Sequence, residues 1–198
     1  MSRQRRRARI GILGGTFNPI HVGHLLIAQD ALEAVGLDRV LFVPSSTPPH
    51  KPLDGNARAT DRRRMVKLAV AGDPRFVLDD REIRRGGKSY SVDTLTELRS
   101  QYPRADFFFI IGADSLSELH LWKDARQLVK LCRFIAVTRP GYRPRPARLP
   151  GLRYRLLDVH RCAISSRDVR RRVRNAQSIR YIVPAAVSRY IERHKLYQ

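Results

Sequence analysis

Apolar residues along the chain fall into two alternating patterns, short continuous runs and longer segments with helical spacing. The runs predict strands at residues 9–13, 39–43, 76–78, 107–111 and 134–137, and a later one at residues 152–157. The helical spacing predicts helices at residues 22–35, 60–70, about 91–101, 165–174 and 184–194, and two short helices within residues 114–131. Strands that alternate with helices in this way predict an α/β fold with a parallel sheet.

Two segments carry the clearest signals for this fold. The run Phe107–Ile111, FFFII, is apolar throughout, as expected for a central strand that is covered on both faces. The helix at residues 22–35 is expected to end at Gly36. Its candidate core positions are Leu25, Leu26, Ala28, Ala31, Leu32 and Val35. We therefore expect a Rossmann-like open parallel sheet with helices on both faces and a small C-terminal helical part.

A chain of 198 residues is expected to form a single domain spanning residues 1–198. Residues 1–8 are strongly basic and are expected to form a disordered tail. The C-terminal helical portion is expected at residues 160–198. Residues 44–56 and 139–151 concentrate proline and other turn-forming or basic residues, so both are expected to be loops.

The polar motifs of the chain lie where predicted strands end. Gly14–His24 follows the first strand, Pro44–Lys51 follows the second, and Gly112–Asp114 follows the FFFII strand. In open parallel sheets, ligands bind beyond the carboxyl ends of the strands. The three segments are therefore expected to meet in one site.

The segment Gly14–His24, GGTFNPIHVGH, has the composition of a phosphate-binding turn. Gly14 and Gly15 permit a tight turn and close approach of backbone N–H groups to a phosphate. His21 and His24 are three residues apart at a helix start, so they share a face that points toward a bound anion. The segment matches neither GxGxxG nor a P-loop. Taken alone, the two histidines also fit a pair of surface or core residues, whereas a metal site lacks an obvious third ligand.

Composition narrows the classes of partner. The net charge of +21 favours anionic partners, although a merely solvated basic surface explains it equally well. No apolar run is long enough to cross a membrane, and no apolar segment of a secretory signal follows the basic start. Two cysteines without metal-ligand spacing, Cys132 and Cys162, fit a reducing cytoplasm, which is the expected location.

Eight segments, in order, resemble the bacterial nicotinate mononucleotide adenylyltransferases along essentially the whole chain. His21-Val22-Gly23-His24 is similar to the (T/H)xGH signature of the nucleotidyltransferase superfamily. The segments are GGTFNPIHVGH, VPSSTPPHK (43–51), SYSVDTL (89–95), IIGADSL (110–116), LWK (121–123), RPG (139–141), ISSRDVR (164–170) and YIVPAAVSRYI (181–191).

The resemblance implies a direct transfer between two small-molecule substrates. The phosphate of nicotinate mononucleotide attacks the α-phosphorus of ATP, giving nicotinate adenine dinucleotide and pyrophosphate in a step of NAD biosynthesis. Mg²⁺ accompanies ATP as cofactor, and no metal site built by the protein is expected. The nucleophile is already an anion, so positioning and charge stabilisation suffice and no general base is needed.

The resemblance also assigns roles to individual residues. Those implied in catalysis are His21, His24, Lys51 and Arg170. Those implied in binding ATP are Gly14, Gly15, Thr16, Phe17, His21, His24, Gly112, Asp114, Ile164, Ser165 and Arg170. Those implied in binding the mononucleotide are Thr16, His50, Lys51, Tyr90, Ser91, Trp122, Lys123 and Arg139. Trp122 would stack on the nicotinate ring, while Ser91 and the backbone N–H of Lys123 would bind its carboxylate.

The chain departs from the family pattern at three positions. Asn18 stands where the family commonly has Asp, Ser91 where Thr is frequent, and Arg167 where Thr is usual. Arg167 adds bulk and charge near the expected triphosphate, so it is left out of the predicted site.

Several alternatives stay open at this point. An adenylyltransferase of the same fold could act on nicotinamide mononucleotide or phosphopantetheine instead. A basic nucleic-acid-binding protein would explain the charge but not the Gly14–His24 segment. Beside the enzyme, no specific nucleic acid is expected, while a non-specific affinity is compatible with the charge. Trp122 and Tyr90 could be core residues, Asp93 and Asp114 helix caps, and the oligomeric state is undetermined.

Overall fold

The computed structural model describes residues 6–48, 54–138, 144–160 and 162–198. Its framework is one sheet of six strands, and every neighbouring pair is parallel. The strands are β1 (Arg9–Gly15), β2 (Arg39–Pro44), β3 (Phe76–Leu78), β4 (Asp106–Gly112), β5 (Arg133–Thr138) and β6 (Tyr154–Asp158). Their order across the sheet is β3-β2-β1-β4-β5-β6. The predicted Rossmann-like parallel sheet is confirmed.

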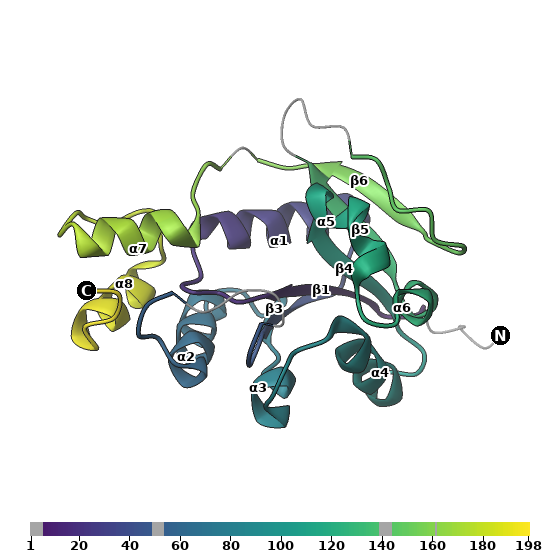
Figure 1. Cartoon of the computed structure of the whole chain (residues 1–198), viewed down its shortest axis with the longest axis horizontal. Helices are drawn as coiled ribbons and strands as arrows, with labels where there is room; N and C mark the ends of the chain where they lie inside the picture. Colours follow the sequence, from purple (N-terminus) through teal and green to yellow (C-terminus); the bar gives the residue numbers. More distant parts are fainter. Residues whose placement is uncertain (1–5, 49–53, 139–143, 161) are drawn as a thin grey trace.

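Helices connect the strands and cover both faces of the sheet. They are α1 (Val22–Val35), α2 (Ala59–Val70), α3 (Arg81–Arg85), α4 (Ser91–Gln101), α5 (Ala113–Ser117), the 3-10 turn η1 (Leu119–Leu121), α6 (Ala125–Leu131), α7 (Ser166–Arg174) and α8 (Ala185–Arg193). Figure 1 shows α1 on one side of the sheet and α3 and α4 on the other. In the same view α7 and α8 lie together at one end of the molecule, beside α2 (Figure 1).

Alternating side chains of the central strands divide the core into two parts. Leu13, Phe42 and Ile110 point to one face, where α1, α2, α7 and α8 pack. Ile12, Val43 and Phe109 point to the other, where α4 and α6 pack. The burial of both faces explains why the central strands are apolar throughout.

The strand order locates the site. Connections leave β1 in one direction across the sheet and reach β4 in the other, so the order reverses between these two strands. A crevice opens at such a reversal, beyond the carboxyl ends of the strands. Gly14–His24 follows β1 at this crevice, and Gly112–Asp114 follows β4.

Most predicted helices and strands agree with the structure to within two residues. Helix α1 matches its prediction at both ends and stops at Gly36, whose φ is +65°. Helix α3 was not predicted. Residues 114–131 hold the two predicted short helices, α5 and α6, with the 3-10 turn η1 between them, whereas Leu25 and Leu26 are only partly buried.

Helix α2 starts after Arg58, whose backbone N–H donates to the carboxylate of Asp61. One further prediction needs correction. Residues 6–8 were assigned to the basic tail, but Arg6 pairs with Asp38. In addition, the Ala8 carbonyl accepts a 2.8 Å hydrogen bond from the backbone of Asp106.

Candidate active site

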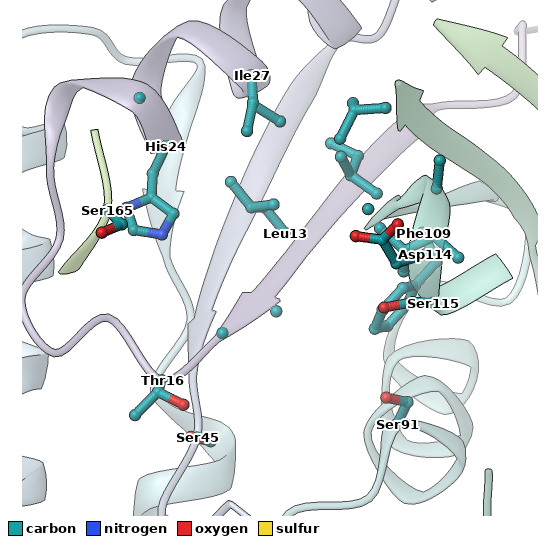
Figure 2. Close-up of a pocket in the computed structure, with 18 of the residues that line it drawn as sticks. Leu13, Thr16, His24, Ile27, Ser45, Ser91, Phe109, Asp114, Ser115 and Ser165 are labelled. Atoms are coloured by element: carbon teal, nitrogen blue, oxygen red, sulfur yellow. The ribbon is translucent and has the colours of Figure 1, made fainter. Parts of the chain in front are cut away.

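A cavity of about 910 Å³ opens at the predicted crevice. Its wall includes most of the predicted site residues, namely Gly14, Gly15, Thr16, His21, His24, Tyr90, Ser91, Gly112, Asp114, Trp122, Lys123, Ile164 and Ser165. Figure 2 shows His24, Asp114 and Ser91 on different sides of this cavity. The structure therefore brings segments from across the chain to one place.

The two histidines lie at the start of α1 in a defined arrangement. The backbone N–H of His21 donates to Nδ1 of His24 over 3.2 Å. An imidazole nitrogen that accepts a hydrogen bond carries no proton, so the neutral ring has its proton on Nε2. The rings of His21 and His24 stack, with centroids 3.7 Å apart. His24 thus keeps an N–H donor at a helix N-terminus, where partial positive charge favours an anion.

Burial keeps both imidazoles uncharged at neutral pH. Desolvation lowers the pKa of His21 from its ordinary value to about 4. Desolvation and the neighbouring His21 ring lower the pKa of His24 to about 3. The pair therefore offers neutral hydrogen-bond donors rather than a fixed positive charge.

Gly23 leaves room for the His21 ring in its folded position. A Cβ atom at residue 23 would lie 3.0 Å from Nδ1 of His21 and 3.3 Å from Sγ of Cys162. A side chain there would require the His21 ring and Cys162 to shift by a few tenths of an ångström. This contact explains the glycine of the His-Val-Gly-His motif physically.

A second helix N-terminus borders the cavity beside His24. Ser165 caps α7 by accepting a 3.1 Å hydrogen bond from the backbone of Asp168, and it lines the cavity with Ile164. The Ser166 hydroxyl donates to the carbonyl of Pro19 over 2.8 Å. The α7 start is therefore fastened to the Gly14–His24 segment.

Aromatic and polar side chains gather at another part of the wall. Trp122 packs edge-on against Phe109, with ring centroids 6.1 Å apart, and it is partly buried. Ser91 is the first residue of α4, so its hydroxyl lies at a helix N-terminus. Lys123 pairs with Asp93 at 3.1 Å and lies over the ring of Tyr90 at 4.7 Å. A flat ring that carries an anionic group fits this combination.

Two predicted residues do not line the cavity. Phe17 is buried beneath His24, with ring centroids 5.0 Å apart. Arg170 is also buried, and it donates to the carbonyl of Asn18 at 2.7 Å and to the carboxylate of Asp54 at 2.8 Å. This guanidinium lowers the pKa of Asp54. Both residues support the Gly14–His24 segment from below. The predicted residues His50, Lys51 and Arg139 lie outside the described residues.

The cavity wall also holds residues that sequence reasoning missed. Glu82 is buried, and desolvation raises its pKa. His160 donates its backbone N–H to the carboxylate of Asp30 and contacts it again through Nδ1 at 2.6 Å. Cys162 lines the cavity, whereas Cys132 lies in the core, where burial raises its pKa to about 12. None of these positions stands in a motif; only the placement of a charged residue among apolar ones signals Asp30.

No group of three or more His, Cys, Asp or Glu among the described residues is arranged to hold a metal ion. Within the same ranges no helix is both long and apolar enough to cross a membrane.

The cytidylyltransferase-like family matches residues 12–172, and the chain belongs to this family of nucleotidyltransferases. Relatives narrow the group. A protein of Thermus thermophilus named probable nicotinate-nucleotide adenylyltransferase is 47% identical over 190 residues, covering 96% of this chain and 100% of its own length. A protein of the same name from Citrifermentans bemidjiense is 44% identical over 211 residues, covering 96% of this chain and 98% of its own. The chain belongs to the nicotinate-nucleotide adenylyltransferase family.

A solved structure supports the fold. Plasmodium falciparum nicotinic acid mononucleotide adenylyltransferase complexed with NaAD superimposes with a TM-score of 0.79 at 20% identity, covering 96% of this chain and 98% of that one. At this level of identity the likeness concerns the fold. The family resemblance predicted from the sequence is confirmed.

Proposed function

We propose that this chain transfers the adenylyl group of ATP to nicotinate mononucleotide, giving nicotinate adenine dinucleotide and pyrophosphate. The observation that carries the proposal is that one cavity joins a phosphate end to a ring end. The phosphate end consists of the starts of α1 and α7, with His21, His24 and Ser165. The ring end consists of Ser91, Trp122 and Lys123.

The transfer needs no base. A phosphate oxygen of the mononucleotide bonds to the α-phosphorus of ATP, and the bond from that phosphorus to the bridging oxygen breaks. Pyrophosphate leaves with the electron pair of that bond. The Nε2–H of His24 and the backbone donors at the α1 start would stabilise the charge on the phosphates. Gly112 and Asp114, beyond β4, would lie beside the adenosine.

The preference for an acid over an amide depends on the ring end. Ser91 at the N-terminus of α4 offers a hydroxyl donor and the partial positive charge of the helix. A carboxylate is stabilised both by the hydrogen bond and by the partial charge of the helix, whereas the neutral amide of nicotinamide is stabilised only by the hydrogen bond. Lys123 lies over the ring of Tyr90 and pairs with Asp93, and its backbone N–H is a further candidate donor to the carboxylate. These features favour nicotinate mononucleotide over nicotinamide mononucleotide and phosphopantetheine.

Mg²⁺ is proposed as the metal that accompanies ATP. Magnesium commonly binds through substrate phosphates, waters and one or two carboxylates. Asp114 is a carboxylate on the cavity wall, and a site of that kind needs no cluster of protein ligands. When bound, the ion would neutralise part of the triphosphate charge.

The cytoplasm is the proposed compartment, because this reaction draws on ATP and feeds NAD biosynthesis. The proposal assigns no specific nucleic-acid partner, and the charge of +21 leaves room for non-specific affinity.

Pyrophosphate release tests the function directly. Purified chain is incubated with ATP and Mg²⁺ and, in separate reactions, with nicotinate mononucleotide, nicotinamide mononucleotide or phosphopantetheine. We expect the largest kcat/KM with nicotinate mononucleotide, with the dinucleotide identified by mass. A larger value for another acceptor would reassign the substrate. Salt-sensitive RNA binding without pyrophosphate from any acceptor would favour the nucleic-acid-binding alternative.

A further inference from the structure

Arg62 is a fully buried cation on α2. It lies one turn before Met65 and Val66, on the face of the helix that packs into the core, and its exposed fraction is 0%. No carboxylate of the described residues forms an ion pair with it. Burial lowers the pKa of its guanidinium, yet an arginine stays protonated in such a setting.

The guanidinium binds three backbone carbonyls from two different segments. Nη1 donates to the carbonyl of Thr16 at 2.8 Å and to that of Ser45 at 2.6 Å. Nη2 donates to the carbonyl of Ser46 at 2.7 Å. Thr16 follows β1 and Ser45 follows β2, and both residues line the cavity. One side chain therefore joins the ends of two neighbouring strands beneath the cavity wall.

A hydroxyl group of the Ser89 segment also bonds to this part of the wall. The backbone N–H of Ser46 donates to the hydroxyl oxygen of Ser89 over 2.9 Å. The Thr94 hydroxyl donates to the buried Glu82 over 2.6 Å, and the Ser89 hydroxyl also opposes the rise in the pKa of Glu82. Ser46 thus bonds to Arg62 through its carbonyl and to Ser89 through its N–H.

Burying an unpaired cation costs free energy, and an apolar side chain of similar length would fill the same space. The planar fork of arginine can span several carbonyls at once, whereas the single ammonium of lysine reaches fewer of them. The Arg62 side chain therefore acts on the two strand ends rather than on the packing of α2.

We propose that Arg62 is a positioning residue for the mononucleotide. It holds the turns at Thr16 and Ser45–Ser46 in one arrangement, so that the acceptor phosphate meets the ATP end of the cavity at the right place. This inference rests on the proposed function. Arg62 contacts neither substrate in this proposal, but it fixes the part of the cavity wall that lies between them. A displacement of about 1 Å in such a wall can lower a rate roughly 100-fold.

The test compares Arg62→Met and Arg62→Lys with the matched variant Arg64→Met. Arg64 is the exposed arginine two residues along the same helix, outside the cavity. For each protein, kcat and the KM for nicotinate mononucleotide are measured with Mg²⁺-ATP. The Kd of a non-hydrolysable ATP analogue without mononucleotide is measured separately, together with the thermal midpoint. Wild-type activity is established first, so failure of the proposed function is recognised before any variant is compared.

We expect Arg62→Met to raise the KM for the mononucleotide and to lower kcat, together by about 10- to 100-fold in kcat/KM, with little change in the Kd of the ATP analogue. Arg62→Lys should recover part of this loss because it retains the charge but reaches fewer carbonyls. Arg64→Met should behave as wild type. If the role of Arg62 is purely structural, Arg62→Met should lower the thermal midpoint and weaken the binding of both nucleotides equally.

Equal weakening of both nucleotides, or wild-type kinetics in Arg62→Met, would overturn the proposal. If Arg62→Met does not fold, Arg62→Lys decides. A raised KM for the mononucleotide at an unchanged thermal midpoint and ATP-analogue Kd supports the positioning role, and wild-type kinetics contradicts it.

Discussion

The two ends of the cavity meet negative charge in different ways. At the phosphate end, the groups on the wall are neutral imidazoles and backbone N–H groups at helix starts. At the ring end, a hydroxyl, an aromatic ring and a lysine already paired with Asp93 are present. In neither part does a described arginine line the cavity, although the chain carries a net charge of +21.

Two described arginines beside the site bind backbone carbonyls and do not line the cavity. Arg62 binds the carbonyls of Thr16 and Ser45, and Arg170 binds the carbonyl of Asn18. Among the described residues, these two guanidinium groups fix the shape of the wall, while neutral donors line the phosphate end of the cavity. Neutral donors can bind phosphate and then release it, because they do not hold a permanent ion pair.

His24→Ala gives the largest expected effect on this comparison. Removing an N–H donor to a developing charge should lower kcat by about 100- to 1,000-fold. The thermal midpoint should stay close to that of wild type, because the ring borders the cavity. His120→Ala is the control, since His120 is exposed and lies outside the cavity. A large loss of stability with little kinetic change would place His24 among the core residues instead.

Trp122→Ala tests the ring end. Loss of a stacking partner should weaken mononucleotide binding by about 10- to 100-fold and ATP binding much less. Trp122→Phe keeps a flat ring and should retain most of the affinity. Because Trp122 also packs on Phe109, the alanine variant should unfold at a lower temperature. Equal weakening of both nucleotides would rule out the stacking role.

Asn18→Asp tests the support beneath the phosphate end. The Asn18 amide donates to the carbonyl of Asp54 at 2.8 Å and accepts from the hydroxyl of Tyr197 at 2.8 Å. A carboxylate keeps the second bond but has no donor for the first, so the free energy of unfolding should fall by about 1–2 kcal/mol.

Asn56→Asp is the matched control for this change. The Asn56 amide donates to the carbonyl of Lys195 and accepts a hydrogen bond from the backbone N–H of Tyr197. Unlike Asn18, it is exposed to solvent. Water replaces its lost partner, so chemical denaturation should show little change. A similar loss in both variants would indicate that burial of Asn18 is unimportant.

The pH dependence of stability tests the neutral state of the two imidazoles. The folded pKa values of His21 and His24 lie below the ordinary 6.5, so the unfolded chain takes up protons first as the pH falls. Their contribution is fully present above about pH 6.5 and is lost progressively toward pH 4 and 3. Buried Glu82, with its raised pKa, acts in the opposite sense. His24→Gln should flatten the fall of the thermal midpoint between pH 6.5 and 4; an unchanged slope would argue against buried neutral histidines.

The sequence allowed prediction of those parts that depend on local patterns. Helix α1 was correct at both ends because its apolar spacing and Gly36 are local signals. Helix α3, REIRR, lacks such a pattern and is held by tertiary contacts, such as the ion pair of Arg85 with Glu97 of α4. Its existence therefore depends on partners that periodicity does not reveal.

The same limit applies to the charged residues of the site. In the run RRRVR (170–174), Arg170 is buried against Asn18 and Asp54, whereas Arg171 and Arg174 are exposed. Only the position of α7 distinguishes them. Arg62 was missed because an arginine on a helix is ordinarily read as solvated, although its spacing from Met65 and Val66 places it on the apolar face.

The protonation of His24 in the free and nucleotide-bound enzyme tests the neutral-donor phosphate end most directly. ¹⁵N-resolved NMR titration of the imidazoles reports which nitrogen carries the proton and at which pH the ring becomes charged. We predict a proton on Nε2, a bare Nδ1 and a pKa of about 3 without nucleotide. Addition of a non-hydrolysable ATP analogue should shift the Nε2 signal and raise the pKa, because the phosphate anion favours the charged ring. A free-enzyme pKa at or above 6.5, or a proton on Nδ1, would contradict the neutral-donor site.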